Sequence, residues 1–235
     1  MMSALIVDDE LHARDELESL LVETSAFKIV GRCGNAVEAL HAIRMERPDV
    51  VFLDIQMPAI SGFELLSMLE DDELPAVVFV TAHDAFAVRA FEERALDYLL
   101  KPVSRERLAK TVERLRTLPG VEARRGYPRA EIKRIPCLVA RAIKLVDVPD
   151  VEFVKSSDAG VYVVTAKGEL FTELTLRVLE ERARLARCHK QFLVNIDQVD
   201  EIRIEEGLAV IRTRSGQQVP VSRRHLPGLR ELLEI

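Results

Sequence analysis

The sequence is poor in cysteine and has no long hydrophobic run. Its three cysteines, Cys33, Cys137 and Cys188, are widely spaced and lack the spacing of metal ligands, so we expect buried thiols. No apolar stretch approaches the ~20 residues that a membrane-spanning helix needs. No basic segment with a cleavage site precedes the first apolar run, so we expect no secretory signal and a cytoplasmic protein.

Repeats and low-complexity tracts are also absent, and charge is distributed unevenly. Residues 1–120 hold 13 Lys and Arg against 22 Asp and Glu, a net of −9, and residues 121–235 hold 20 against 17, a net of +3. The length of 235 residues favours two domains of roughly 100–130 residues each. An acidic half joined to a mildly basic half indicates that a polyanion partner would meet the C-terminal half.

Strands and helices alternate five times in residues 1–118. Short apolar runs rich in β-branched residues predict strands buried on both faces, as in a parallel sheet, and apolar residues at helical spacing separate them. The strands are predicted over 4–7, 27–31, 50–53, 76–80 and 97–100, and the helices over 11–22, 36–45, 63–69, 84–94 and 105–118. This order predicts a doubly wound, five-stranded parallel sheet, a flavodoxin-like α/β fold.

Residues 119–136 have the composition of a linker, with prolines and glycines among many charges. Residues 137–235 form the second predicted domain, in which short β-like runs outnumber helices. Its strands are predicted over 138–146, 151–155, 160–166, 169–171, 202–205, 208–212 and 218–221, and its helices over 174–185 and 223–233. Many short strands at close spacing predict a mostly antiparallel β domain.

Polar residues follow four strands of the first half at their carboxyl ends. The residues in these positions are Asp8, Asp9, Asp54, Thr81 and Lys101. Ligands bind at this edge of a doubly wound sheet, and converging carboxylates repel unless a hard cation such as Mg²⁺ neutralises them. Each residue alone is more often an ordinary helix cap or surface group. Together they predict a site for a transferred phosphoryl group, with Asp54 as the nucleophile.

The first half resembles the receiver domain of two-component response regulators. The matching segments are "LIVDDE" at 5–10, "DVVFLDIQMPAISGFEL" at 49–65, "VVFVTAHD" at 77–84 and "ALDYLLKP" at 95–102. The resemblance implies that Asp54 takes a phosphoryl group from a phosphohistidine of a partner sensor histidine kinase. It also implies that Asp9, Asp54 and the backbone carbonyl of Gln56 hold Mg²⁺ directly, with Asp8 acting largely through water.

The same resemblance assigns roles around the phosphoryl group. Thr81 and Lys101 would contact its oxygens, and the peptide bond between Lys101 and Pro102 would be cis. Tyr98 stands where the family places its switch aromatic, although a plain core tyrosine is the alternative. The predicted dimer surface includes Arg89, Glu92, Arg94 and Asp97, which as bare sequence are more often a solvated face.

The second half offers no catalytic pairing. It offers three polar segments in a β scaffold, at 156–158, 187–191 and 222–225, whose cations suit contacts with phosphates and base edges. Surface cations without a partner are the alternative for each segment alone.

Residues 137–235 resemble the LytTR DNA-binding domain. The matching segments are "DVEFVKSSDAGVYV" at 150–163, "GELFTELTLRVLEE" at 168–181, "ARCHKQFLVNIDQVDEI" at 186–202 and "VPVSRRHL" at 219–226. The resemblance places base contacts at Lys190 and Arg223, with His189 and Arg224 beside them. The third contact falls near Val161, which cannot hydrogen-bond, so Ser157 or Asp158 would act there instead. Asn195 is expected to support the fold.

The whole chain is therefore expected to be a phosphorylation-switched transcription factor. Phosphorylation would drive formation of a homodimer and bring two output domains onto promoter DNA with direct-repeat half-sites. The end-to-end pattern is similar to a subfamily that pairs with a membrane-bound LytS-type kinase responding to pyruvate. One rival is an aspartyl-phosphate phosphatase or phosphotransferase, disfavoured because Gln56 supplies no second catalytic acid. Another rival keeps the receiver and makes the β domain a protein-binding module.

Overall fold

The computed structural model describes residues 1–82, 95–117, 130–140, 142–205 and 208–233, and it divides into two compact units, Met1–Ala130 and Glu131–Ile235. The helix predicted over 84–94 and most of the predicted linker lie outside the described residues. Within the described part of the chain, no helix combines the length and the apolar content that crossing a membrane requires.

The first unit contains a five-stranded parallel sheet in the order β2-β1-β3-β4-β5. The strands are β1 (Met2–Val7), β2 (Phe27–Cys33), β3 (Val50–Leu53), β4 (Ala76–Thr81) and β5 (Asp97–Leu100). Every residue of the central strands β3 and β4 is buried, as the unbroken apolar runs predict. The strand order reverses between β1 and β3, which is where a doubly wound sheet opens a crevice at its carboxyl edge.

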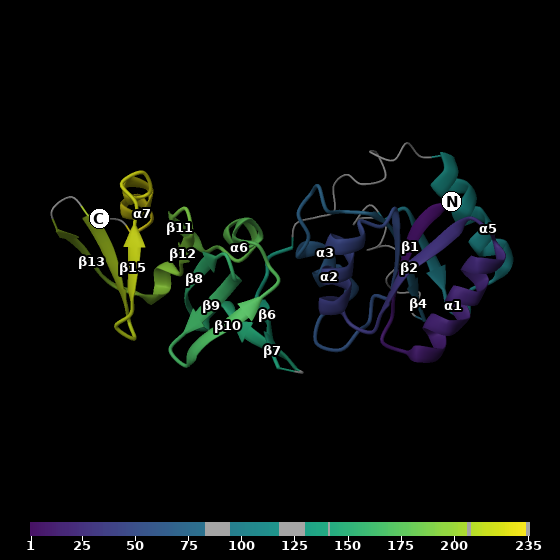
Figure 1. Ribbon diagram of the computed structural model, residues 1–235, viewed down its shortest axis with the longest axis horizontal. Coiled ribbons are helices and arrows are strands. Elements are labelled where there is room, and N and C mark those ends of the chain that lie inside the picture. Colours follow the sequence, from purple (N-terminus) through teal and green to yellow (C-terminus); the bar gives the residue numbers. More distant parts are fainter. Residues whose placement is uncertain (83–94, 118–129, 141, 206–207, 234–235) are drawn as a thin grey trace. The chain divides into compact units, whose positions relative to one another are not determined.

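Helices cover both faces of this sheet (Figure 1). Helices α1 (Leu11–Glu23) and α5 (Arg105–Thr117) lie on one face, and α2 (Ala36–Glu46) and α3 (Gly62–Ser67) lie on the other. On the α1/α5 face, Leu17 and Leu21 of α1 and Leu108 of α5 pack in one core with Ile6 and Phe52 of the strands. The predicted flavodoxin-like α/β fold is confirmed.

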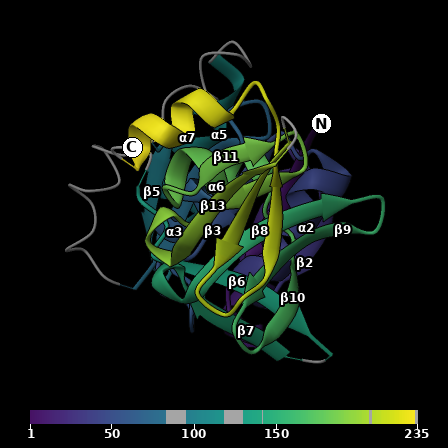
Figure 2. The ribbon, with the colours of Figure 1, turned by 90° about the vertical axis from the view of Figure 1, so that its left-hand side faces the viewer.

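The second unit is built from two antiparallel sheets (Figure 2). The larger has the order β11-β12-β8-β9-β10-β6-β7, and the smaller has the order β13-β14-β15. The strands are β6 (Arg134–Val139), β7 (Ala142–Asp147), β8 (Val151–Ser157), β9 (Gly160–Thr165), β10 (Gly168–Thr172), β11 (Ala186–His189), β12 (Phe192–Val194), β13 (Val199–Glu205), β14 (Leu208–Thr213) and β15 (Gln218–Val221). The predicted antiparallel β domain is confirmed.

Two helices and two short 3-10 turns complete this unit: α6 (Leu176–Arg182), α7 (Leu226–Leu232), η3 (Val148–Asp150) and η4 (Ile196–Gln198). Its core joins the two sheets and α7, because Phe153 and Val194 of the larger sheet pack with Ile211 and Val219 of the smaller one and with Leu229 of α7.

All three cysteines are buried and free. Burial raises the pKa of Cys33, Cys137 and Cys188 to about 12, so the thiols stay protonated at neutral pH. The expectation of buried thiols is confirmed.

Three element predictions need correction. The run 138–146 is not one strand, because β6 and β7 form a hairpin within it. The turn has Ala140 at φ +50°, a left-handed conformation that alanine rarely adopts, so the sequence does not indicate a turn there. Strand β6 begins at Arg134, inside the segment predicted as linker. Strands β11 and β12 were not predicted, because β11 is mostly polar and β12 is an apolar run of only three residues.

Candidate functional site

The carboxyl ends of β1, β3 and β5 bring a lysine and two carboxylates into contact. The ammonium Nζ of Lys101 lies 2.6 Å from Oδ2 of Asp8 and 2.8 Å from Oδ2 of Asp54. Asp9 is exposed beside them, and one carboxylate oxygen from each of Asp8, Asp9 and Asp54 lies within 4.8 Å of the others. Four of the five strand-end residues that the sequence singled out, Asp8, Asp9, Asp54 and Lys101, therefore form one cluster at the sheet edge.

The backbone holds Asp54 at the base of this cluster. Its N–H donates to the carbonyl of Val7 at 2.8 Å, which ties the end of β3 to the end of β1. Its Oδ1 accepts the N–H of Gln56 at 3.1 Å. The chain then returns past Asp54 at Gly62, where a Cβ atom would lie 2.4 Å from the Asp54 carbonyl oxygen. Only glycine fits this crossing without a shift of the backbone.

Helix α3 begins at the same crossing. Ser61 caps it: the hydroxyl of Ser61 accepts the N–H of Glu64, and the Glu64 carboxylate accepts the N–H of Ser61 at 2.9 Å. This capping box fixes the chain that leaves Asp54, and so it contributes to the position of the turn that carries Gln56.

Electrostatics couple the lysine to the acids. Burial alone would lower the pKa of Lys101, but the hydrogen bonds to Asp54 and Asp8 outweigh it and hold that pKa above its ordinary value. For Asp8 the balance goes the other way, since burial raises its pKa despite the opposing hydrogen bond from Lys101. The raised pKa of Lys101 keeps its ammonium charged, and the raised pKa of Asp8 shows that Lys101 does not fully offset the burial of that carboxylate.

Two backbone features fix the ends of β4 and β5 beside this cluster. The Lys101–Pro102 peptide is cis, as the resemblance implied. The N–H of Lys101 donates to the carbonyl of Thr81 at 2.9 Å, which joins the ends of β5 and β4. The hydroxyl oxygen of Thr81 is buried and has no hydrogen-bond partner among the described residues. A buried hydroxyl costs free energy unless a partner arrives, so this group is available for an oxygen-rich ligand.

Tyr98 and Asp97 lie on β5, a few residues before Lys101. Tyr98 is half-buried, and its carbonyl accepts from Arg107 at 3.0 Å. Asp97, which was predicted on an exposed dimer surface, is only 2% exposed. Its carboxylate accepts from Arg107 and from Arg114 at 2.9 Å, and from the hydroxyl of Thr111 at 2.7 Å. The prediction for Asp97 is therefore wrong, because α5 covers and neutralises it. Arg89, Glu92 and Arg94 lie outside the described residues.

The three polar segments of the second unit lie side by side. The N–H of Ser156 donates to the carbonyl of Gln191 at 2.9 Å, and the N–H of Ser222 donates to the carbonyl of Cys188 at 2.9 Å. These bonds attach the β11–β12 hairpin both to the end of β8 and to the segment before α7. The exposed side chains that they bring together are Ser157, Asp158, Lys190, Arg223 and Arg224.

The other residues of this unit that the sequence singled out are less exposed. His189 is half-buried: its Nδ1 accepts the N–H of Gln191 at 3.2 Å, and its ring meets Phe192 edge to face at 5.7 Å. Val161 pairs with Ser156 in the β8–β9 ladder. Asn195 is buried and donates to the carbonyls of Val148 at 3.1 Å and Val151 at 2.9 Å, which confirms its structural role.

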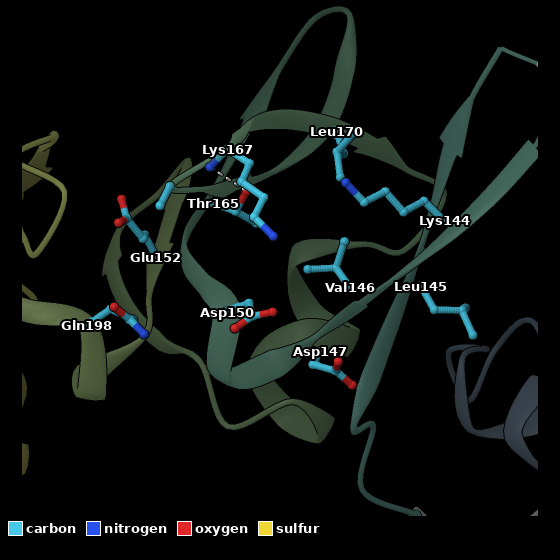
Figure 3. Close-up of a pocket in the computed structure, with 11 residues that line it drawn as sticks. Lys144, Leu145, Val146, Asp147, Asp150, Glu152, Thr165, Lys167, Leu170 and Gln198 are labelled. Carbon is cyan, nitrogen blue, oxygen red and sulfur yellow. Dashed lines mark hydrogen bonds between the residues drawn. The ribbon is translucent and has the colours of Figure 1, made fainter.

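A separate hollow of about 210 Å³ lies at the other end of β8 and is lined by none of the predicted site residues (Figure 3). Lys167 and Asp150 extend into it. Glu152 forms part of its wall and is 2% exposed, and its carboxylate accepts from the hydroxyls of Thr213 at 2.9 Å and Ser215 at 2.7 Å. These bonds link the larger sheet to the β14–β15 turn, so Glu152 holds the two sheets together.

Two family models match the chain, one in each unit. The model described as the response regulator receiver domain matches residues 4–113, and the model described as the LytTr DNA-binding domain matches residues 141–234. The fold and the carboxylate cluster therefore define a receiver domain joined to a DNA-binding domain of the LytTR class.

Two relatives that match over nearly their whole length support this class. The chain is 50% identical over 234 residues to an uncharacterized response regulatory protein of Vibrio cholerae, covering 99% of each chain. It is 50% identical over 237 residues to the transcriptional regulatory protein BtsR of Salmonella typhi, again covering 99% of each. A solved response regulatory domain of mrkE from Klebsiella pneumoniae is 35% identical, with a TM-score of 0.45, over 49% of this chain and 96% of that one. The chain belongs to the two-component response regulators of the LytTR family, and it is similar to the BtsR proteins.

Proposed function

We propose that Asp54 receives a phosphoryl group from a phosphohistidine of a sensor histidine kinase, and that this modification controls DNA binding and transcription. The observation that carries the proposal is the contact between Lys101 and Asp54 beside a carboxylate cluster, in a chain that also carries a LytTR domain. In the transfer, an Asp54 carboxylate oxygen forms a bond to phosphorus while the bond from phosphorus to the kinase histidine nitrogen breaks.

The residues around Asp54 suit this transfer. Mg²⁺ suits the oxygen donors of Asp8, Asp9 and Asp54. By the family resemblance, Asp9, Asp54 and the carbonyl of Gln56 would hold the ion and Asp8 would act largely through water. When bound, the ion supplies positive charge to the phosphoryl oxygens. Lys101 adds a second, fixed positive charge, and the hydroxyl of Thr81, which has no partner among the described residues, donates to a phosphoryl oxygen. The product is a regulatory aspartyl phosphate, and the chain is not a turnover enzyme.

The switch follows from Thr81 and Tyr98. Once Thr81 bonds to the phosphoryl group, the half-buried Tyr98 turns inward and alters the surface around β5. The altered surface favours a receiver homodimer, which places two LytTR domains on direct-repeat half-sites in promoter DNA. Linking two weak binding units raises affinity through effective concentration.

The DNA-binding surface consists of the three joined segments of the second unit. Lys190 and Arg223 contact bases, with His189 and Arg224 beside them. The family's third base contact falls near Val161, which cannot hydrogen-bond, and Ser157 or Asp158 makes that contact instead. The support for this surface is the pair of backbone hydrogen bonds that joins the segments, together with the exposure of Ser157, Asp158, Lys190, Arg223 and Arg224. We place the protein in the cytoplasm with its target DNA, and we propose a membrane-bound LytS-type kinase, responsive to pyruvate, as its partner.

Acetyl phosphate with Mg²⁺ tests the phosphoacceptor. The wild-type chain should gain one phosphoryl group by intact-protein mass spectrometry, and Asp54→Asn should gain none. Asp72→Asn, an exposed acid distant in sequence from the cluster, is the matched control and should react like the wild type. Modification of Asp54→Asn at the wild-type rate would overturn the assignment of Asp54.

The two rival functions predict different results. A phosphatase would release phosphate from small esters over many turnovers, whereas we expect a single stoichiometric modification. A protein-binding β module would not bind DNA specifically, whereas we expect specific binding that weakens steeply with salt.

A further inference from the structure

Arg187 stands in the polar segment 187–191, but its side chain turns away from that exposed surface. The guanidinium donates from Nε to Oε2 of Glu180 on α6 at 2.8 Å, and Nη2 donates to the same oxygen. The third nitrogen, Nη1, donates to the carbonyl of Lys190 at 3.4 Å. The Arg187 side chain is only 20% exposed. One arginine thus connects a helix to the turn that carries Lys190.

The β11–β12 hairpin, which carries this turn, is held on its other sides by the backbone. The Gln191 carbonyl accepts from Ser156, and the Cys188 carbonyl accepts from Ser222. The Arg187 side chain connects this turn to α6, because its guanidinium bonds both to the Lys190 carbonyl and to the Glu180 carboxylate. The position of the Lys190 side chain therefore depends on the Glu180–Arg187 pair as well as on the strands.

We propose that Arg187 is a positioning residue for DNA recognition, and that Glu180 and Arg187 act as one unit that fixes the Lys190 turn. This inference rests on the proposed DNA-binding function. It assigns a favourable role in DNA binding to an acidic residue, Glu180, which by charge alone would oppose binding to a polyanion.

The sign of the Glu180→Ala effect separates this role from direct contact. If Arg187 contacted a phosphate, loss of Glu180 would free the guanidinium and remove a repulsive charge, and binding would tighten. If Arg187 positions the turn, loss of Glu180 weakens binding although the protein becomes more positive. Alanine is a good helix former, so this change is compatible with α6.

The test uses the full chain and a DNA duplex that the wild-type protein enriches from a random-sequence pool. Glu180→Ala and Arg187→Gln should each bind this duplex about tenfold more weakly, because each change displaces Lys190 and one good base contact is worth about that much in affinity. The double variant should bind no more weakly than either single variant, because the pair acts as a unit. Glu181→Ala removes the same charge from the next position of α6 and should bind at least as tightly as the wild type.

The salt dependence gives a second readout. Affinity falls with salt, and a lost phosphate contact reduces the steepness of log affinity against log salt by about 0.9. A positioning role therefore predicts an unchanged slope for Arg187→Gln. Arg187→Lys keeps the charge but loses the forked geometry, and it should bind as weakly as Arg187→Gln. Unfolding temperatures equal to the wild type's show that the fold is retained.

Two outcomes would overturn the inference: tighter binding by Glu180→Ala, or full affinity in Arg187→Lys together with a reduced slope in Arg187→Gln. Failure of the proposed function is distinguishable, because the wild-type chain would then enrich no sequence and Arg223→Ala would change nothing.

Discussion

The Lys101 ammonium lies 2.8 Å from the Asp54 carboxylate, although the two residues are 47 positions apart in the chain. The contact forms because parallel strands end at one edge of the sheet, so that β3 and β5 bring their following residues to the same crevice. Since the same ammonium is 2.6 Å from Asp8, it is the fixed positive charge between two buried acids.

Replacing Lys101 with methionine should impair phosphorylation. The variant keeps the aliphatic part of the side chain but removes the charge that stabilises the transferring phosphoryl group, so we expect the rate with acetyl phosphate to fall about 100-fold. Rates are measured by mass spectrometry at saturating Mg²⁺. Lys110→Met removes an exposed lysine from α5 and should react at the wild-type rate. Equal rates for both variants would remove Lys101 from the site.

Asp97 should make the receiver domain sensitive to acid. Burial would raise its pKa, but hydrogen bonds from Arg107 and Thr111 outweigh burial and hold the pKa below its ordinary value. The stabilisation from a lowered carboxyl pKa is complete above the unfolded value, about 4, and is lost as pH falls through the folded value. Asp97→Asn should therefore cost about 1–3 kcal/mol of unfolding free energy at pH 7.

Calorimetry of the full chain at pH 7 and pH 3 measures this effect. The difference between the wild type and Asp97→Asn should be large at pH 7 and should shrink at pH 3. Asp71→Asn changes an exposed acid and serves as the control. A difference that stays constant with pH would mean that the Asp97 charge contributes nothing.

Val161→His tests the departure from the family pattern. Val161 pairs with Ser156 in the β8–β9 ladder, close to the segments that we assign to DNA binding. A histidine there restores a hydrogen-bonding side chain, and we expect tighter binding to LytTR-family sites by about 1–3 kcal/mol, measured by fluorescence anisotropy. Val161→Leu, which has no hydrogen-bonding group, is the control. Unchanged affinity would indicate that recognition in this chain does not use the position.

The core strands and the carboxylate cluster were predictable because their signals are local. Four apolar residues before Asp54 specify a buried strand, and a polar residue at such a strand's end is visible in the sequence. The strand bounds shifted by a few residues, as with β2, which ends at Cys33 instead of Gly31.

The missed features depend on contacts between distant residues. Asp97 is buried because Arg107 and Arg114 of α5 neutralise it, and nothing next to Asp97 in the sequence signals this pairing. Arg187 is one of several cations in its polar segment, and nothing next to it in the sequence indicates that it bonds to Glu180 on α6. The β6–β7 turn was hidden because it uses Ala140 at positive φ, without a glycine or asparagine to mark it.

The central claim is that phosphorylation of Asp54 controls DNA binding. The most direct test is DNase footprinting on the duplex that the wild-type protein selects, with and without acetyl phosphate and Mg²⁺, for the wild type and Asp54→Asn. We expect phosphorylation to lower the wild-type concentration needed for half-protection by about tenfold or more through dimerisation, and to leave the variant unchanged. Equal footprints for phosphorylated and unphosphorylated wild-type protein would contradict the account.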